Sequence, residues 1–200
     1  MHPRLSALIT LALAGTIFPP TSLHAQSSAS VTDAGMWGSI SAAAGGARLA
    51  CDICDPTRDG GPALEVAFGT HASPTVRVGI DGGGWTFRDG DFRETVYTAG
   101  VVAEIHPRPG SGLHLIGGLG WSGYRANDVD ADPDEQGFRY DGVRLRLGLG
   151  WDLPLAGSWS VGNRVTLDAS SLGTLHDEGV PIARSVGLSL VRFGVYLRRR

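Results

Sequence analysis

The sequence contains no lysine, only two cysteines, and no apolar run long enough for an ordinary membrane-spanning helix. Its longest apolar stretch, at residues 5–18, has roughly 14 residues, whereas a transmembrane helix needs about 20. No cysteine follows this stretch, which argues against a lipid-anchored mature end. Arginine is therefore the only residue type that is always positively charged, and the net charge is −3. This composition gives no support for nucleic-acid binding.

The first 25 residues have the features of a secretory signal peptide. Arg4 gives the start a positive charge, the apolar stretch follows, and Ala25 precedes a cleavage site before Gln26. We therefore expect residues 1–25 to be a cleaved signal peptide and residues 26–35 a flexible leader. Residues 36–200 are expected to form one folded domain. An uncleaved membrane anchor is the alternative.

The two cysteines, Cys51 and Cys54, are separated by only two residues. A structural zinc site needs four ligands, and the chain offers no further cysteine to complete one. The redox motif with this spacing begins a helix in a thioredoxin-like fold, which the surrounding pattern does not predict. In an exported protein we expect a disulfide that closes a local loop. The sequence thus predicts no metal site and no cofactor.

Glycine is abundant, and it lies within segments that alternate between apolar and polar residues. The sequence has 30 glycines, far above the usual share of about 7%. The clearest alternation is at residues 143–153, where every second residue is apolar: Val143, Leu145, Leu147, Leu149, Trp151 and Leu153. Successive side chains of a strand point to opposite faces, so this segment predicts a strand with one apolar face. Its length of about 11 residues suits a tilted transmembrane strand.

Seven further segments are expected to be strands: 36–45, 63–72, 75–85, 94–106, 113–124, about 159–168, and 182–197. Bulges are expected at the Gly82 to Gly84 run and near Leu190, where the apolar parity changes. Short turns are predicted near Ser73, Gly110 and Ala156, and longer loops near Cys51, Arg88, Asp130 and residues 172–180. Together these predict an all-β fold: an eight-stranded, antiparallel, up-and-down transmembrane β-barrel.

Alternation alone does not determine which face of the barrel is inside. The polar face mixes large charged residues with glycines, as a narrow lumen requires. Large aromatics fall near strand ends, as membrane-interface residues do: Trp37, Tyr97, Trp121, Trp151, Trp159 and Phe193. We therefore favour a membrane barrel. The alternative is a soluble, exported, lipocalin-like barrel with an apolar lumen that binds an apolar ligand.

The pattern resembles the OmpA/OmpX-type small outer-membrane β-barrels over nearly all of the mature chain. The resemblance implies insertion into a bacterial outer membrane and a filled, polar interior. Such chains commonly end on an aromatic residue that the assembly machinery recognises, whereas here Tyr196 and Leu197 are followed by Arg198, Arg199 and Arg200.

Polar-face charges are expected to pair inside the lumen, because unpaired buried ions are costly. The predicted network comprises Glu65, Arg77, Asp81, Glu104, Arg144, Arg146, Arg164, Asp168 and Arg192, with Arg184 and Asp152 as further partners. A small selective pore is the alternative, which a barrel of about eight strands leaves little room for.

The acidic stretch from Asp128 to Glu135 resembles a calcium-binding loop only superficially. An EF-hand needs glycine at the sixth position and glutamate at the twelfth, where this chain has Pro133 and Arg139. We expect a solvated loop that holds divalent cations weakly at a lipopolysaccharide surface.

A lipid-modifying enzyme is the third hypothesis. The pair His71 and Ser73 resembles the His-x-Ser pair of outer-membrane lipid A deacylases, in which a histidine activates a serine. The expected topology puts this pair at a periplasmic turn, away from a substrate in the outer leaflet, and Glu94 and His106 are no better placed. No catalysis is therefore expected.

The sequence thus predicts a monomeric outer-membrane barrel with a structural or surface-interaction role carried by its extracellular loops. The expected partners are outer-membrane lipid, lipopolysaccharide and the barrel assembly machinery, with no nucleic acid. The soluble alternative would place the protein in the periplasm or outside the cell.

Overall fold

The computed structural model describes residues 35–51, 54, 57–128, 138–177 and 180–199. The predicted signal peptide, almost all of the leader and most of the acidic stretch lie outside these residues. Within the described part of the chain, no helix is long and apolar enough to cross a membrane.

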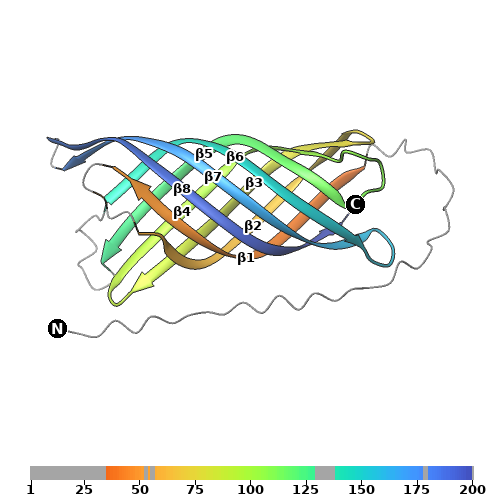
Figure 1. The fold of residues 1–200 in the computed structure, drawn as a ribbon, viewed down its shortest axis with the longest axis horizontal. Helices are drawn as coiled ribbons and strands as arrows, with labels where there is room; N and C mark the ends of the chain where they lie inside the picture. Colours follow the sequence, from red (N-terminus) through yellow and green to blue (C-terminus); the bar gives the residue numbers. More distant parts are fainter. Residues whose placement is uncertain (1–34, 52–53, 55–56, 129–137, 178–179, 200) are drawn as a thin grey trace. The chain divides into compact units, whose positions relative to one another are not determined.

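Eight antiparallel strands form a closed barrel in sequence order (Figure 1). They are β1 (Met36–Ala50), β2 (Asp59–Ser73), β3 (Val76–Asp89), β4 (Phe92–Ile105), β5 (Leu113–Asp128), β6 (Phe138–Pro154), β7 (Trp159–Asp177) and β8 (Val180–Arg199). Strand β8 closes the ring by pairing with β1 from Gly38 opposite Arg199 to Ala50 opposite Gly187. The predicted all-β, eight-stranded up-and-down barrel is confirmed.

The two ends of the barrel differ in their connections. We call the end with the connections 74–75, 106–112 and 155–158 the turn end, and the opposite end, with 51–58, 90–91, 129–137 and 178–179, the loop end. The chain enters β1 and leaves β8 at the turn end. All three turns predicted from proline and glycine lie there.

Several strands are longer than the sequence predicts, and two expected loops are wrong. Strands β3 and β4 continue to Asp89 and Phe92, which pair, so only Gly90 and Asp91 connect them. Gly90 has a φ of 58°, which suits a two-residue hairpin. Most of residues 172–180 also belong to β7 and β8. Charged residues in the first segment and polar residues in the second suggested loops, but the strands continue through most of both segments.

Neither predicted bulge is present. Strand β3 pairs without a shift through Gly82 and Gly83, and β8 pairs without a shift through Leu190. A Cβ on Gly83 would lie 2.7 Å from the carbonyl oxygen of Leu64, so this glycine permits close strand approach. The register shifts instead between His71 and Ser73, and again in β7 beyond Ser171.

Candidate functional site

In every strand, the alternating side chains that are mainly apolar face the outside of the barrel. Leu147 is 55% exposed, whereas its neighbour Arg146 is 1% exposed and faces the lumen. The belt of exposed apolar side chains includes Ile40, Leu64, Val66, Phe68, Ile80, Val101, Leu119, Leu145, Leu149, Val165 and Val195. A continuous apolar exterior around a charged interior suits a lipid bilayer. This arrangement is the reverse of the soluble lipocalin-like alternative, which needs an apolar lumen and a polar exterior.

Four of the six predicted interface aromatics lie on the exterior toward the ends of the strands. Tyr97 and Trp121 lie toward the loop end, and Trp151 and Trp159 toward the turn end. Phe193 is also exposed, but it lies opposite Val165 within the belt and not at its edge.

The prediction that Trp37 lies at the membrane interface is wrong. Its side chain is only 3% exposed inside the barrel, where Nε1 donates to the carbonyl oxygen of Thr70 at 3.3 Å. The Arg198 guanidinium lies 5.4 Å from its ring centroid. Trp37 has the parity opposite to that of Ile40, so strand alternation directs it inward.

A central cluster of charges fills the middle of the lumen. It consists of Glu65, Asp81, Asp168, Arg144, Arg146, Arg164 and Arg192, all of them buried. Arg146 contacts all three acids: Asp168 at 2.9 Å, Glu65 at 2.8 Å and Asp81 at 2.9 Å. Arg144 binds both oxygens of Asp81 at 2.8 and 2.9 Å, and Arg164 lies 2.9 Å from Glu65. Arg192 pairs with both Glu65 and Asp168.

A second group, the turn-end cluster, lies nearer the turns. It consists of Arg77, Glu104, His106, His114, Asp152, Tyr196 and Arg198, all of them buried. Arg198 bridges the two acids, at 2.5 Å from Glu104 and 2.8 Å from Asp152. Arg77 contacts the same two acids at 3.4 and 3.3 Å, and the Tyr196 hydroxyl donates to Asp152.

Glycines make room for these large side chains, as the polar-face pattern indicates. A Cβ on Gly100 would lie 2.7 Å from Nη2 of Arg144. A Cβ on Gly150 would lie 2.3 Å from Nε2 of His114. These two positions therefore admit a large neighbour only because they carry no side chain.

Toward the loop end the lumen contains an apolar layer. We call this group the apolar plug; it consists of Ala47, Ala63, Trp85, Val96, Tyr124, Ala126, Leu172, Val186, Leu188 and Leu190. Trp85 is 1% exposed and donates from Nε1 to the carbonyl oxygen of Gly45 at 3.1 Å. Val186, Leu188 and Leu190 point inward and form part of this plug. Their alternation, which suggested a bulge, needs none.

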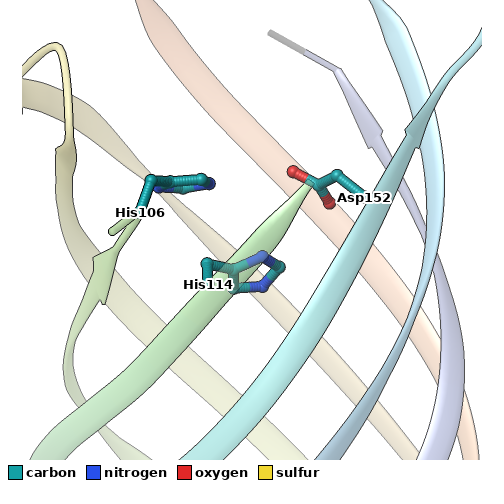
Figure 2. Close-up of side chains that lie close together, drawn as sticks. All are labelled: His106, His114 and Asp152. Carbon is teal, nitrogen blue, oxygen red and sulfur yellow. The ribbon is translucent and has the colours of Figure 1, made fainter. Parts of the chain in front are cut away.

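Two histidines and an aspartate converge within the turn-end cluster (Figure 2). His106 follows β4, His114 is on β5 and Asp152 is on β6. One ligand atom from each lies within 4.8 Å of the others. The two imidazole rings are stacked, with centroids 5.1 Å apart. Burial and the nearby Arg77 lower the pKa of His106 to about 4, which keeps it neutral at pH 7.

All nine predicted network residues face the lumen, but sequence reasoning missed several of their partners. His106, His114, Tyr196 and Arg198 were not expected in the network. The parity that Arg198 and Tyr196 share with Arg192 is the signal that could have placed them there. The side chain of Arg184 lies outside the described residues.

His71 and Ser73 do not contact each other as a catalytic pair would. Nδ1 of His71 lies 2.9 Å from the carbonyl oxygen of Gly35, and Nε2 accepts from Arg77 at 3.2 Å. The Ser73 hydroxyl lies 3.4 Å from that of Thr75. At the other end of the barrel, the predicted disulfide between Cys51 and Cys54 is confirmed.

No family model and no curated protein matches this sequence. Solved structures match its fold. Neisserial surface protein A (NspA) has a TM-score of 0.53 at 14% identity, over 80% of this chain and 95% of its own. Ail, the attachment invasion locus protein of Yersinia pestis, has a TM-score of 0.51 at 13% identity, over 81% of this chain and 97% of its own. A second Ail structure, in complex with the heparin analogue sucrose octasulfate, has a TM-score of 0.50 at 13% identity, over 82% and 98%.

At these identities the likeness establishes the fold alone: a small, closed, eight-stranded β-barrel, as the sequence resemblance implies. The membrane setting rests on the barrel itself. Because closed barrels with an apolar belt and a polar interior are the strand-built structures that span outer membranes, this chain is an outer-membrane protein.

Proposed function

We propose that this barrel is a closed scaffold that presents its loop end at the cell surface, in a structural or surface-interaction role, and does not conduct solutes. The observation that carries the proposal is the filled lumen. The central cluster occupies the middle of the barrel with mutually paired charges, and the apolar plug occupies the lumen toward the loop end.

The packing of the lumen supports a closed state. An eight-stranded barrel has an interior just wide enough for its own side chains. Arg146, Trp85 and Leu190 are each about 1% exposed, so these large side chains are buried in both layers, although a cavity of about 160 Å³ lies beside Ala47 and Tyr124 toward the loop end. One cavity beside Glu65 and Arg192 has a volume of only about 10 Å³, roughly the space for one water molecule.

The outer rim offers a binding surface for anionic groups. Arg88 pairs across strands with Arg93, and Arg125 pairs with Arg139, all four exposed. Like charges directly opposite each other are destabilising, so an anion between them is favoured. Among the described residues, the only carboxylate contact of these four is Arg139 to Asp141, at 3.8 Å.

Lipopolysaccharide is the partner that this rim fits best. The four arginines lie on consecutive strands, β3 to β6, beyond the interface aromatics Tyr97 and Trp121. Arginine binds phosphate oxygens through a planar fork of donors. The complex of Ail with a sulfated heparin analogue supports the same chemistry, because sulfate and phosphate esters present similar anionic oxygens.

Conductance tests the closed scaffold. Proteoliposomes that contain the folded barrel, verified by a heat-dependent gel shift, are fused with a planar bilayer. The proposal predicts no stable channels. Stable, long-lived channels from verified, folded protein would contradict it and favour the pore.

Lipopolysaccharide retention tests the rim. Wild-type barrel is extracted from outer membrane in mild detergent, and lipopolysaccharide phosphate per barrel is measured. The variant with Arg88→Gln, Arg93→Gln, Arg125→Gln and Arg139→Gln should retain several-fold less, and sucrose octasulfate should displace lipopolysaccharide from the wild type. The matched control neutralises Arg108 and Arg199 at the turn end. Equal retention in the rim variant and the control would show that the rim arginines do not bind lipopolysaccharide.

We also propose that the barrel has no lipid-modifying activity, since both ring nitrogens of His71 are engaged away from Ser73. Lipid A mass spectra from cells with and without the protein should be identical. A lost acyl chain that depends on Ser73 would overturn this.

We further propose that the protein is a monomer and that the barrel assembly machinery inserts it into the membrane. The ring closed by β1 and β8 leaves no open sheet edge for a second copy to pair with. Export by a signal peptide cleaved after Ala25 predicts a mature protein that begins at Gln26, which N-terminal sequencing checks.

A further inference from the structure

The two histidines of the turn-end cluster each have an unsatisfied ring nitrogen. Nε2 of His106 and Nε2 of His114 are buried and have no hydrogen-bond partner. The side chains are 7% and 0% exposed. Because a buried nitrogen without a partner is costly, both atoms favour a ligand between them.

The tautomer of His114 leaves a lone pair on Nε2. Its Nδ1 lies 3.1 Å from the carbonyl oxygen of Gly112, and a carbonyl only accepts hydrogen bonds. Nδ1 must therefore carry the proton, which makes Nε2 the free electron-pair donor. A metal-binding histidine commonly has this arrangement, with its other nitrogen bonded to a backbone carbonyl.

We propose that His106, His114 and Asp152 form a binding site for a divalent transition-metal ion at the turn end of the lumen. The ligands would be Nε2 of each histidine and one carboxylate oxygen of Asp152 (Figure 2). Two imidazoles with one carboxylate suit zinc, copper or nickel, whereas calcium and magnesium prefer oxygen ligands alone.

The spacing requires only a small adjustment. One possible ligand atom from each residue, a ring nitrogen of each histidine and a carboxylate oxygen of Asp152, lies within 4.8 Å of the other two. With metal–ligand distances of about 2.0–2.1 Å, neighbouring ligand atoms around a tetrahedral ion are roughly 3.3 Å apart. His106 lies in the connection 106–112 outside the strands, so its side chain can approach the other two without a change in the barrel wall.

The charges around the site also permit a cation. Arg77 and Arg198 are balanced by Glu104 and Asp152, and the cluster is neutral when both histidines are neutral. Arg77 holds its two carboxylates at 3.4 and 3.3 Å, longer than the contacts of Arg198. The metal would therefore displace Arg77 from Asp152 and leave the bridge through Arg198 in place.

Calorimetric titration with Zn²⁺ tests the site. The barrel is prepared without a polyhistidine tag, in mild detergent at neutral pH. The wild type should bind one tight equivalent. His106→Gln and His114→Gln should each weaken binding by about tenfold or more. His71→Gln is the matched control, because this histidine lies at the same end but both of its ring nitrogens are engaged, and it should leave zinc affinity unchanged.

Copper binding is measured on the unaltered protein, so this test remains valid even if a histidine variant fails to fold. The electron paramagnetic resonance spectrum of the Cu²⁺-loaded wild type should show coupling to two imidazole nitrogens. A wild type that binds no tight equivalent, zinc affinity unchanged in both variants, or an equal loss in His71→Gln would overturn the site. The two histidines would then be a stacked structural pair only.

Discussion

Arg146 and Glu65 meet across the lumen, with Nη2 of the arginine 2.8 Å from Oε2 of the glutamate. They belong to β6 and β2, which are not neighbours in the sheet. The same guanidinium also reaches Asp81 on β3 and Asp168 on β7. This one side chain therefore joins strands from opposite parts of the ring through a water-poor interior.

Removal of the Arg146 charge should strongly destabilise the barrel. Arg146→Met keeps most of the side-chain volume but leaves three buried carboxylates without their shared partner. Breaking a buried ion pair in this way costs about 3–5 kcal/mol. Urea unfolding in detergent or lipid, followed by tryptophan fluorescence, measures the change. Arg139→Met at the exposed rim is the control and should cost about 1 kcal/mol or less. Equal costs would mean that the central cluster contributes little.

The apolar plug should contribute to stability as a packed core does. Leu190→Ala should lower the free energy of unfolding by about 2–5 kcal/mol, because it leaves a cavity in a layer that is almost fully buried. Leu147→Ala removes the same atoms from the lipid-facing surface, where no enclosed cavity forms, and should cost less. A larger loss for Leu147→Ala would contradict the inward packing of Leu190.

The cost of placing a charge on the outer surface should depend on its depth in the membrane. Leu147→Arg places a charge within the apolar exterior and should destabilise the barrel by about 2–4 kcal/mol in a bilayer. Thr70→Arg places the same charge on the exterior near the turn end and should cost about 0–1 kcal/mol. Unfolding in liposomes measures both. If the two substitutions had the same small effect, the exterior would not be immersed in lipid.

His106 should make stability depend on pH. Burial, with the charge of Arg77, lowers its pKa from 6.5 to about 4 in the folded protein. Between these values the unfolded state binds a proton that the folded state does not, so stability is fully present above pH 6.5 and falls as the pH drops toward 4. Urea midpoints across this range, with a chelator present, measure the slope. His106→Gln should flatten it relative to the wild type; an unchanged slope would rule out this histidine as its source.

The faces of the strands could be predicted from the sequence, because strand alternation is strict where one face meets lipid. The parity of Arg144 and Arg146 against Leu145 and Leu147 put both arginines on one face, and the glycines that share this face indicated that it lines the lumen. The same reasoning applied to β1 would have placed Trp37 inside. Its aromatic character suggested the interface instead, and parity overrode that preference.

The partners of the lumen charges could not be predicted in the same way. Alternation gives the face of a residue but not its height in the barrel, which depends on strand tilt and register. Arg146 and Glu65 are far apart in the sequence and meet only because the ring closes. The convergence of His106, His114 and Asp152 likewise depends on three segments that no sequence motif connects.

The apolar plug was missed because the sequence was expected to have one polar lumen face throughout. Val186, Leu188 and Leu190 are apolar on the inward parity, so they suggested a shift in register. The barrel instead changes the character of its lumen along its length, from paired ions to packed apolar side chains. No local signal in β8 distinguishes these two explanations.

The most direct test of the membrane barrel is fractionation of the protein expressed in a Gram-negative host, followed by a gel of the membrane fraction with and without boiling. A membrane barrel should sediment with the outer membrane, and its mobility should change on heating as the folded barrel unfolds. Recovery in the soluble periplasm with no heat-dependent shift would contradict it, because the apolar belt would then face water.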